Sequence, residues 1–330
     1  MAQCGYTRYD DKRCEETTHA GQPLCILHDK APSKDAAAFL KALKSKVDKE
    51  ESDAAFTEVD LAGVVFPPDF RWEDVRTKGD ALVKQISFKD VTFSGGAYFW
   101  GARFSGDATF WDAKFSGDAS FWGATFSGDA HFTGATFSGD AHFTGATFSG
   151  AAHFWWATFS GAAHFGGATF SGGAYFWGAR FSGDATFWDA KFSGDASFWG
   201  ATFSGDAAFG DATFQRWLRF HGTTFPRNGG PGVVTFANVT LEKPERAYFQ
   251  DVNLSRVSFL GTDIREIHFL NATWAKLPQR RRPSRRRWPF TTMRAVWKKR
   301  ARWLRRWPRR WPLVLMTALW RRRPMWLWRW

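Results

Sequence analysis

Three cysteines and one histidine near the start of the chain have the types and spacing of metal ligands. Cys4, Cys14, Cys25 and His28 form the pattern C-x9-C-x10-C-x2-H. Three thiolates and an imidazole complete a tetrahedral set, which is typical of a structural zinc site. A segment this short has no other core, so the metal would supply its folding free energy. We predict a zinc knuckle in residues 1–32; the alternative is that the cysteines are merely buried or free.

The rest of the chain is dominated by a repeat. From Phe88 to Phe225, phenylalanine recurs 26 times at spacings that alternate between five and six residues, and for the 22 from Phe99 to Phe214 the residue two places earlier is alanine. Residues two apart lie on the same face of an extended strand, so Ala and Phe point inward together. A helix is excluded because these steps scatter the phenylalanines around its axis, and because each unit carries a Ser-Gly pair.

The eleven-residue unit FSGDATFWDAK resembles the pentapeptide-repeat family, in which a small residue at i−2 and Leu or Phe at the centre recur every five residues. The resemblance covers residues 55–274 and implies an all-β fold, a right-handed quadrilateral β-helix (a pentapeptide-repeat solenoid). Every second side carries an extra residue, so we expect each coil to comprise two eleven-residue units, in which the glycine accommodates a bulged or wider corner. The stretch CILHDK, residues 25–30, is similar to the Cys/His segment that opens some bacterial members.

Four segments follow from these patterns. Residues 1–32 form the Cys3His knuckle, and residues 33–54 form a helical linker or cap, since Phe39, Leu40, Leu43 and Val47 recur at helical spacing. Residues 55–274 form the β-helix, with a loop near 226–233 where the sequence reads PRNGGPG. Residues 275–330 form an Arg/Trp-rich tail.

Charge is concentrated in that tail. The chain carries +13, but residues 275–330 contain 17 Arg, 3 Lys and no acidic residue, so the part of the chain before the tail carries −7. Interleaved Arg and Trp suit an anionic membrane surface or nucleic acid. We predict instead that the tail is disordered or a frameshift product. The cysteine content and the absence of a secretory apolar segment predict a cytoplasmic location, with peripheral membrane attachment as the alternative.

With two units per coil, outward side chains that recur every second unit should align in columns. The aromatic columns are Trp155, Trp177 and Trp199, and the pair Trp100 and Trp122. Exposed aromatic columns mark a partner or ligand surface, or they simply stabilise neighbouring coils. Two histidine pairs align in the same way, His131 with His153 and His142 with His164. Paired histidines can chelate a metal, but these have no evident acidic or thiolate companions.

No phosphate-binding glycine loop, nucleophile elbow or unusual carboxylate pair is found, so we predict that the protein is not an enzyme. The favoured function is a non-catalytic scaffold that binds an unknown protein partner, with structural zinc as its cofactor. One alternative is a scaffold held at a membrane surface by the tail. The other is a topoisomerase inhibitor that mimics DNA, as the quinolone-resistance pentapeptide proteins do. Mimicry and nucleic-acid binding are both disfavoured; residues 88–225 carry 11 Asp against 7 Lys or Arg, a net charge of only −4.

Overall fold

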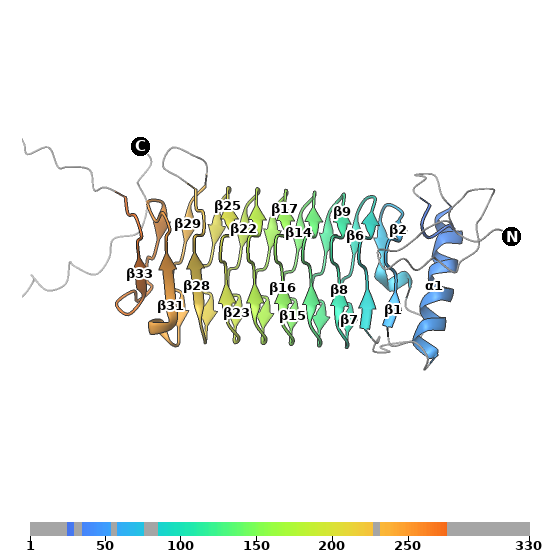
Figure 1. The fold of residues 1–330 in the computed structure, drawn as a ribbon, viewed down its shortest axis with the longest axis horizontal. Helices are drawn as coiled ribbons and strands as arrows, with labels where there is room; N and C mark the ends of the chain where they lie inside the picture. The colour runs from blue at the N-terminus through green and yellow to red at the C-terminus, as the bar shows by residue number, and fades with distance from the viewer. Residues whose placement is uncertain (1–24, 30–34, 54–57, 76–84, 227–231, 276–330) are drawn as a thin grey trace, which may run out of the picture. The chain divides into compact units, whose positions relative to one another are not determined.

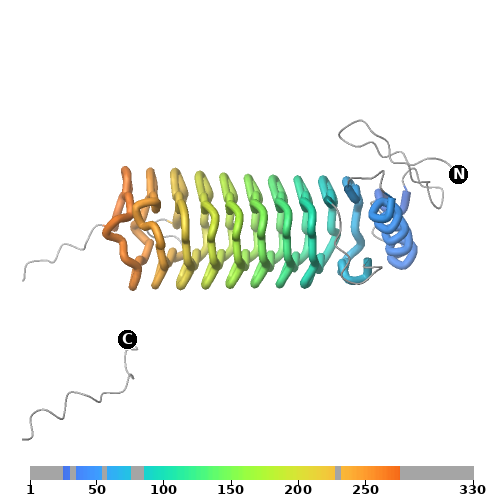
Figure 2. The backbone as a smooth tube through the Cα atoms, turned by 90° about the horizontal axis from the view of Figure 1, so that it is seen from below, coloured from blue at the N-terminus to red at the C-terminus, as the bar shows by residue number. Residues whose placement is uncertain are grey.

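The protein is described by a computed structural model that covers residues 25–29, 35–53, 58–75, 85–226 and 232–275. These residues form a rod, a four-sided parallel β-helix with the helix α1 (Ala36–Ser52) at its N-terminal end (Figure 1). Figure 2 shows the coils stacked along the rod. Cys4, Cys14, the loop residues 227–231 and the tail from residue 276 onward lie outside the described residues.

Four parallel sheets form the four faces of the rod. The first has ten strands, in spatial order β1 (Glu58–Asp60), β4 (Gln85–Ser87), β8 (Ala108–Thr109), β12 (Ala130–His131), β16 (Ala152–His153), β20 (Ala174–Tyr175), β24 (Ala196–Ser197), β28 (Leu218–His221), β31 (Ala247–Gln250) and β33 (His268–Leu270). The second has nine: β3 (Phe70–Arg71), β6 (Ala97–Tyr98), β10 (Ala119–Ser120), β14 (Ala141–His142), β18 (Ala163–His164), β22 (Ala185–Thr186), β26 (Ala207–Ala208), β29 (Val234–Thr235) and β32 (Val257–Ser258).

The other two faces have seven strands each. One contains β2 (Val65–Phe66), β5 (Thr92–Phe93), β9 (Lys114–Phe115), β13 (Thr136–Phe137), β17 (Thr158–Phe159), β21 (Arg180–Phe181) and β25 (Thr202–Phe203). The other contains β7 (Arg103–Phe104), β11 (Thr125–Phe126), β15 (Thr147–Phe148), β19 (Thr169–Phe170), β23 (Lys191–Phe192), β27 (Thr213–Phe214) and β30 (Thr240–Leu241). Short 3-10 helices, η1 (Trp72–Asp74) and η2 (Pro244–Arg246), interrupt the coils near the two ends.

Each coil of the central rod comprises two eleven-residue units, as expected from the sequence. Ala119 pairs with Ala141, and Phe126 pairs with Phe148. Successive strands β8, β9, β10 and β11 occupy the four faces in turn before β12 returns to the first. The ten-stranded and nine-stranded faces are therefore opposite each other.

Phenylalanine rings fill the interior and stack along the rod. Phe121 lies 4.9 Å from Phe143, with 2° between the ring planes, and it meets Phe132 of the opposite face edge-on at 5.3 Å. The stacking distance equals the spacing of neighbouring strands, so one geometry satisfies both the hydrogen bonds and the rings. Each buried ring contributes roughly 1.5–3 kcal/mol, so stability accumulates coil by coil.

The glycine of each Ser-Gly corner is required because neighbouring coils approach closely there. A Cβ on Gly194 would lie 2.1 Å from the carbonyl oxygen of Gly172. These glycines do not have positive φ, so the constraint is space rather than backbone conformation. Aspartates beside several of these corners complete the stacking, as when Asp107 Oδ1 accepts a hydrogen bond from the backbone N–H of Asp129 at 2.8 Å. Asp107 and Asp129 thus lie in register and are joined by this bond, although both side chains are acidic.

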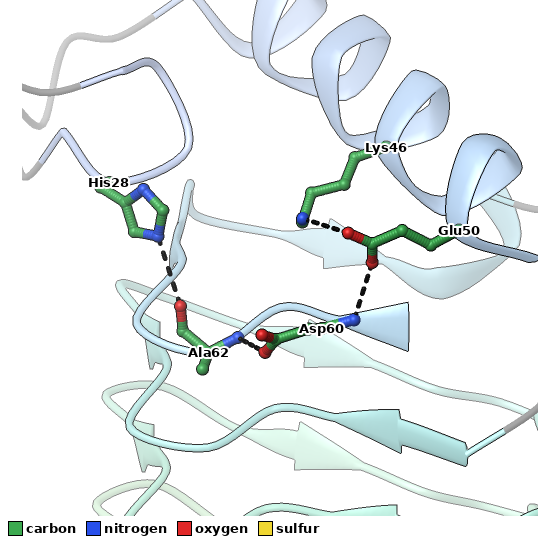
Figure 3. Close-up of polar contacts among 5 residues, drawn as sticks. All are labelled: His28, Lys46, Glu50, Asp60 and Ala62. Carbon is green, nitrogen blue, oxygen red and sulfur yellow. Dashed lines mark hydrogen bonds and ion pairs between the residues drawn. The ribbon is translucent and has the colours of Figure 1, made fainter. Parts of the chain in front are cut away.

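The N-terminal edge of the rod is covered by α1, which begins at Ala36 and ends at Ser52. The helix therefore extends beyond Val47, the last residue of the predicted apolar pattern. Phe39 packs edge-on against Phe66 at 5.6 Å. The carboxylate of Glu50, itself buried, accepts a hydrogen bond from the backbone N–H of Asp60 at 2.8 Å (Figure 3). The helix thus covers the first coil and pairs an edge N–H of β1.

A glycine substitution tests the corner constraint. Gly194→Ala should lower the free energy of unfolding by about 1–3 kcal/mol, because the new methyl group overlaps backbone that cannot move aside. Gly210→Ala is the matched control, since its Cβ would meet only the carbonyl oxygen of Ala237 at 3.7 Å. Chemical denaturation measures both variants. Equal stability of the two would contradict the close-approach explanation.

Candidate functional site

Aromatic side chains line the outer surface of the ten-stranded face. Trp155 stacks on Trp177 with 5.2 Å between ring centroids and 8° between planes. Trp177 then meets Trp199 edge-on at 5.9 Å. The structure therefore brings these three predicted residues into one continuous column.

A second column runs beside the first on the same face. His131 stacks on His153 at 4.8 Å, and His153 stacks on Tyr175 at 5.3 Å. Tyr175 meets Trp177 at 5.7 Å, which joins the two columns. The face presents a continuous aromatic surface across four successive strands, β12, β16, β20 and β24.

A groove opens where this second column is interrupted by a small side chain. Ser197 occupies the position held by Tyr175 one coil earlier and by Arg219 one coil later. The indole N–H of Trp177 donates a hydrogen bond to Ser197 Oγ at 2.7 Å. The resulting groove has a volume of about 410 Å³ and is lined by Trp177, Ser197, Trp199, Trp217, Arg219, His221, Tyr248 and Gln250.

The wall of the groove nearest the C-terminal end of the rod is held in place by a guanidinium group and stacked rings. The guanidinium of Arg219 lies 4.6 Å from the ring centroid of Trp217, and Tyr248 stacks on the same indole at 5.6 Å. His221 Nδ1 lies 3.8 Å from a carboxylate oxygen of Asp251. The groove combines apolar ring surface with hydrogen-bond donors and one constant positive charge.

Sequence periodicity alone did not identify Trp217, which keeps the two-unit register but lies outside the predicted tryptophan columns, or Tyr248, which follows a change of register. Leu218 pairs with Ala247 and not with Thr240, because the chain inserts extra residues after Phe225. Counting two repeat units forward therefore fails beyond this point. The predicted loop near 226–233 is the feature of the sequence that indicates this change of register.

The predicted pair Trp100 and Trp122 lies on the nine-stranded face, on the opposite side of the rod from the groove. Trp100 donates its indole N–H to Ser120 Oγ at 2.7 Å, which reproduces the bond between Trp177 and Ser197. Both tryptophans are exposed, by 48% and 61%. The structure thus divides the five predicted tryptophans between two faces.

His153 is the perturbed titratable group of the aromatic surface. Burial lowers its pKa below the ordinary value of 6.5, and the neighbouring His131 lowers it further, while Asp129 acts in the opposite direction. Its Nδ1 atom and the Nε1 atom of Trp155 are buried without a hydrogen-bond partner. The aromatic cover over this histidine therefore favours the neutral ring.

Cys25 and His28 are the two described residues of the predicted zinc knuckle. Both are buried, and Cys25 Sγ lies 3.1 Å from His28 Nδ1. His28 Nε2 lies 3.3 Å from the carbonyl oxygen of Ala62 (Figure 3). A proton on Nε2 would donate to this carbonyl and leave the Nδ1 lone pair toward the thiol, an arrangement that fits a zinc ligand with an outer-shell partner.

A comparison with protein families agrees with this architecture. The family model described as pentapeptide repeats (9 copies) matches residues 67–114, 79–125, 110–155 and 157–202. The repeats in residues 67–155 and 157–202 therefore belong to the pentapeptide-repeat family. No curated protein matched it. In the described part of the chain, no helix is long and apolar enough to cross a membrane.

Two solved structures are similar to the chain. HetL, a pentapeptide repeat protein involved in heterocyst differentiation regulation from the cyanobacterium Nostoc sp., is 14% identical, with 66% of this chain and 87% of that chain covered and a TM-score of 0.18. QnrB1, a plasmid-mediated fluoroquinolone resistance protein, is 16% identical, with 56% and 88% covered and a TM-score of 0.16.

Zinc binding by the knuckle stays a prediction with a direct test. Protein purified without chelator should contain one zinc ion bound by Cys4, Cys14, Cys25 and His28, and Cys25→Ser should lose most of it, because a thiolate ligand is removed. Atomic emission gives the zinc content. Ser197→Ala, a substitution in the rod, is the control. A zinc content in Cys25→Ser equal to that of the unsubstituted chain would remove the proposed site.

The lowered pKa of His153 predicts a pH dependence of stability. Between that pKa and about 6.5, the unfolded chain binds more protons than the folded one, so this contribution is complete above pH 6.5 and is lost as the pH falls through the window. Thermal unfolding at pH 7.5 and pH 5.5 should differ less in His153→Gln than in the unsubstituted protein. Thr144→Ala, on the opposite face, serves as control. An unchanged difference in His153→Gln would refute the assignment.

Proposed function

We propose that this protein is a non-catalytic scaffold that binds a protein partner at the groove of the ten-stranded face. The observation that carries the proposal is the groove itself, where Trp177, Trp199 and Trp217 surround a hollow floored by Ser197. Tryptophan, tyrosine and arginine are the residues most often responsible for binding energy at protein interfaces. All three types are present here around one cavity.

The rod beneath the groove favours binding without rearrangement. Most groove residues lie on or directly beside a strand that is hydrogen-bonded to its neighbours on both sides, as β24 is to β20 and β28, and Trp177 and Trp199 lie in the turns that follow β20 and β24. A surface fixed in this way loses little conformational entropy when a partner docks. This rigidity supports an interaction role in which the partner adapts to the rod.

The acidic residues of the rod do not favour the alternative of DNA mimicry. Several corner carboxylates accept hydrogen bonds from the backbone of the next coil, as Asp140 does from the N–H of Ala162 at 2.8 Å. These carboxylates therefore have a structural role. The alternative of attachment to a membrane surface depends on residues 275–330, which lie outside the described residues apart from Ala275.

Paired substitutions on opposite faces test the scaffold function. Trp199→Ala combined with Trp217→Ala should reduce recovery of a cross-linked partner from cells of the native source by at least about tenfold, since two interface tryptophans contribute about 2 kcal/mol or more each. The matched control combines Trp122→Ala with Trp188→Ala, two tryptophans of the nine-stranded face that are each 61% exposed. Quantitative mass spectrometry compares the recovered proteins.

Recovery of the same partner at the same level by both double variants would contradict binding at the groove. Thermal unfolding of each variant shows whether the rod is retained. Because the substituted rings point outward, both variants should unfold cooperatively near the temperature of the unsubstituted protein.

A further inference from the structure

The chain contains one short motif twice, on opposite faces of the rod. Residues 129–132 and 140–143 both read Asp-Ala-His-Phe, and one coil later residues 151–154 and 162–165 both read Ala-Ala-His-Phe. In each case the two histidine rings stack at 4.8 Å. Two nearly identical constellations of one aspartate and two histidines result.

The neighbours of the first constellation cover it. Trp155 lies edge-on against His153 at 4.9 Å, and Tyr175 stacks on the other side at 5.3 Å. His153 Nδ1 is buried without a partner under these rings. No metal ion can reach that nitrogen while the rings are in place.

The second constellation has small residues at the equivalent positions. Gly166 stands where Trp155 stands on the opposite face, and Thr186 stands where Tyr175 stands. One ligand atom from each of Asp140, His142 and His164 lies within 4.8 Å of the other two, and the three residues are partly exposed. Contrary to the expectation from sequence, these histidines do have an acidic companion.

We propose that Asp140, His142 and His164 bind a divalent transition-metal ion on the nine-stranded face. Two imidazoles and one carboxylate suit zinc, and three protein ligands leave a fourth position for water. A ligand nitrogen directs its lone pair in the plane of its ring. The stacked rings of His142 and His164 must therefore tilt toward each other when they bind one ion. Gly166 provides the space for this tilt.

The surrounding charges favour a cation at this position. Asp140 uses Oδ1 to accept a hydrogen bond from the backbone N–H of Ala162 at 2.8 Å, which fixes the position of its carboxylate. Asp184, one coil beyond Ala162, adds a second negative charge close to the ring of His164. The site is distinct from the predicted N-terminal knuckle, which lies at the end of the rod and uses thiolates.

Zinc titration of the full-length protein tests the site, with zinc retained in any N-terminal knuckle. Isothermal titration should detect one further zinc ion in the unsubstituted protein. His142→Gln and His164→Gln should each weaken this binding by at least tenfold, because each removes one of three ligands. Asp140→Asn keeps an oxygen acceptor for the N–H of Ala162 and should weaken binding through loss of charge.

The covered constellation supplies the control. His131→Gln and His153→Gln should leave the additional zinc binding unchanged. The proposal is overturned if no further zinc binds, or if substitutions in the two histidine pairs reduce binding equally, which would indicate unspecific surface histidines. Without added zinc, each variant must unfold at a temperature close to that of the unsubstituted protein. Added zinc should raise the unfolding temperature of only those variants that bind it.

Discussion

The coincidence of two distances underlies the whole structure. Parallel strands stack at about 4.8 Å, and aromatic rings stack favourably at the same distance. The phenylalanines meet both conditions, as Phe143 and Phe165 do at 4.9 Å with nearly parallel planes. Inward residues therefore need no adjustment from coil to coil. Outward residues inherit the same spacing, which is why histidines and tryptophans form columns on the surface.

The corners must respect that distance too, and the two corner types do so differently. At the Ser-Gly corners the backbones come so close that no side chain fits, and glycine is used for its size. At the other corners one residue adopts positive φ, which glycine accepts without strain and which aspartate tolerates. Trp156 holds this conformation at φ 54°, although its ring is large. The core of the rod is thus compatible with an unfavourable corner residue when the neighbouring coils fix the backbone.

The fold could be predicted from the sequence because its signal is the recurrence of Phe88 to Phe225, and every one of these rings is buried. The groove could not, because it depends on a register that the inserted residues after Phe225 change and on the small size of Ser197 between larger neighbours. The acidic companion of His142 is not evident from the sequence either. The repeat suggests only a solvated corner residue at Asp140, but its carboxylate lies within reach of the two histidines and also caps the next coil.

The internal duplication shows how such a rod acquires different surfaces from the same sequence. Residues 92–130 are identical to residues 169–207, so the copy is displaced by seven eleven-residue units. Seven units make three and a half coils, and the copy therefore emerges on the opposite face. Trp100 and Trp177 accordingly make the same hydrogen bond on opposite sides of the rod, but only Trp177 borders the groove. The difference arises from the neighbouring coils, since the repeat itself is unchanged. A binding surface on this protein is therefore a property of several adjacent coils, and inserting half-coils changes that surface without changing the core.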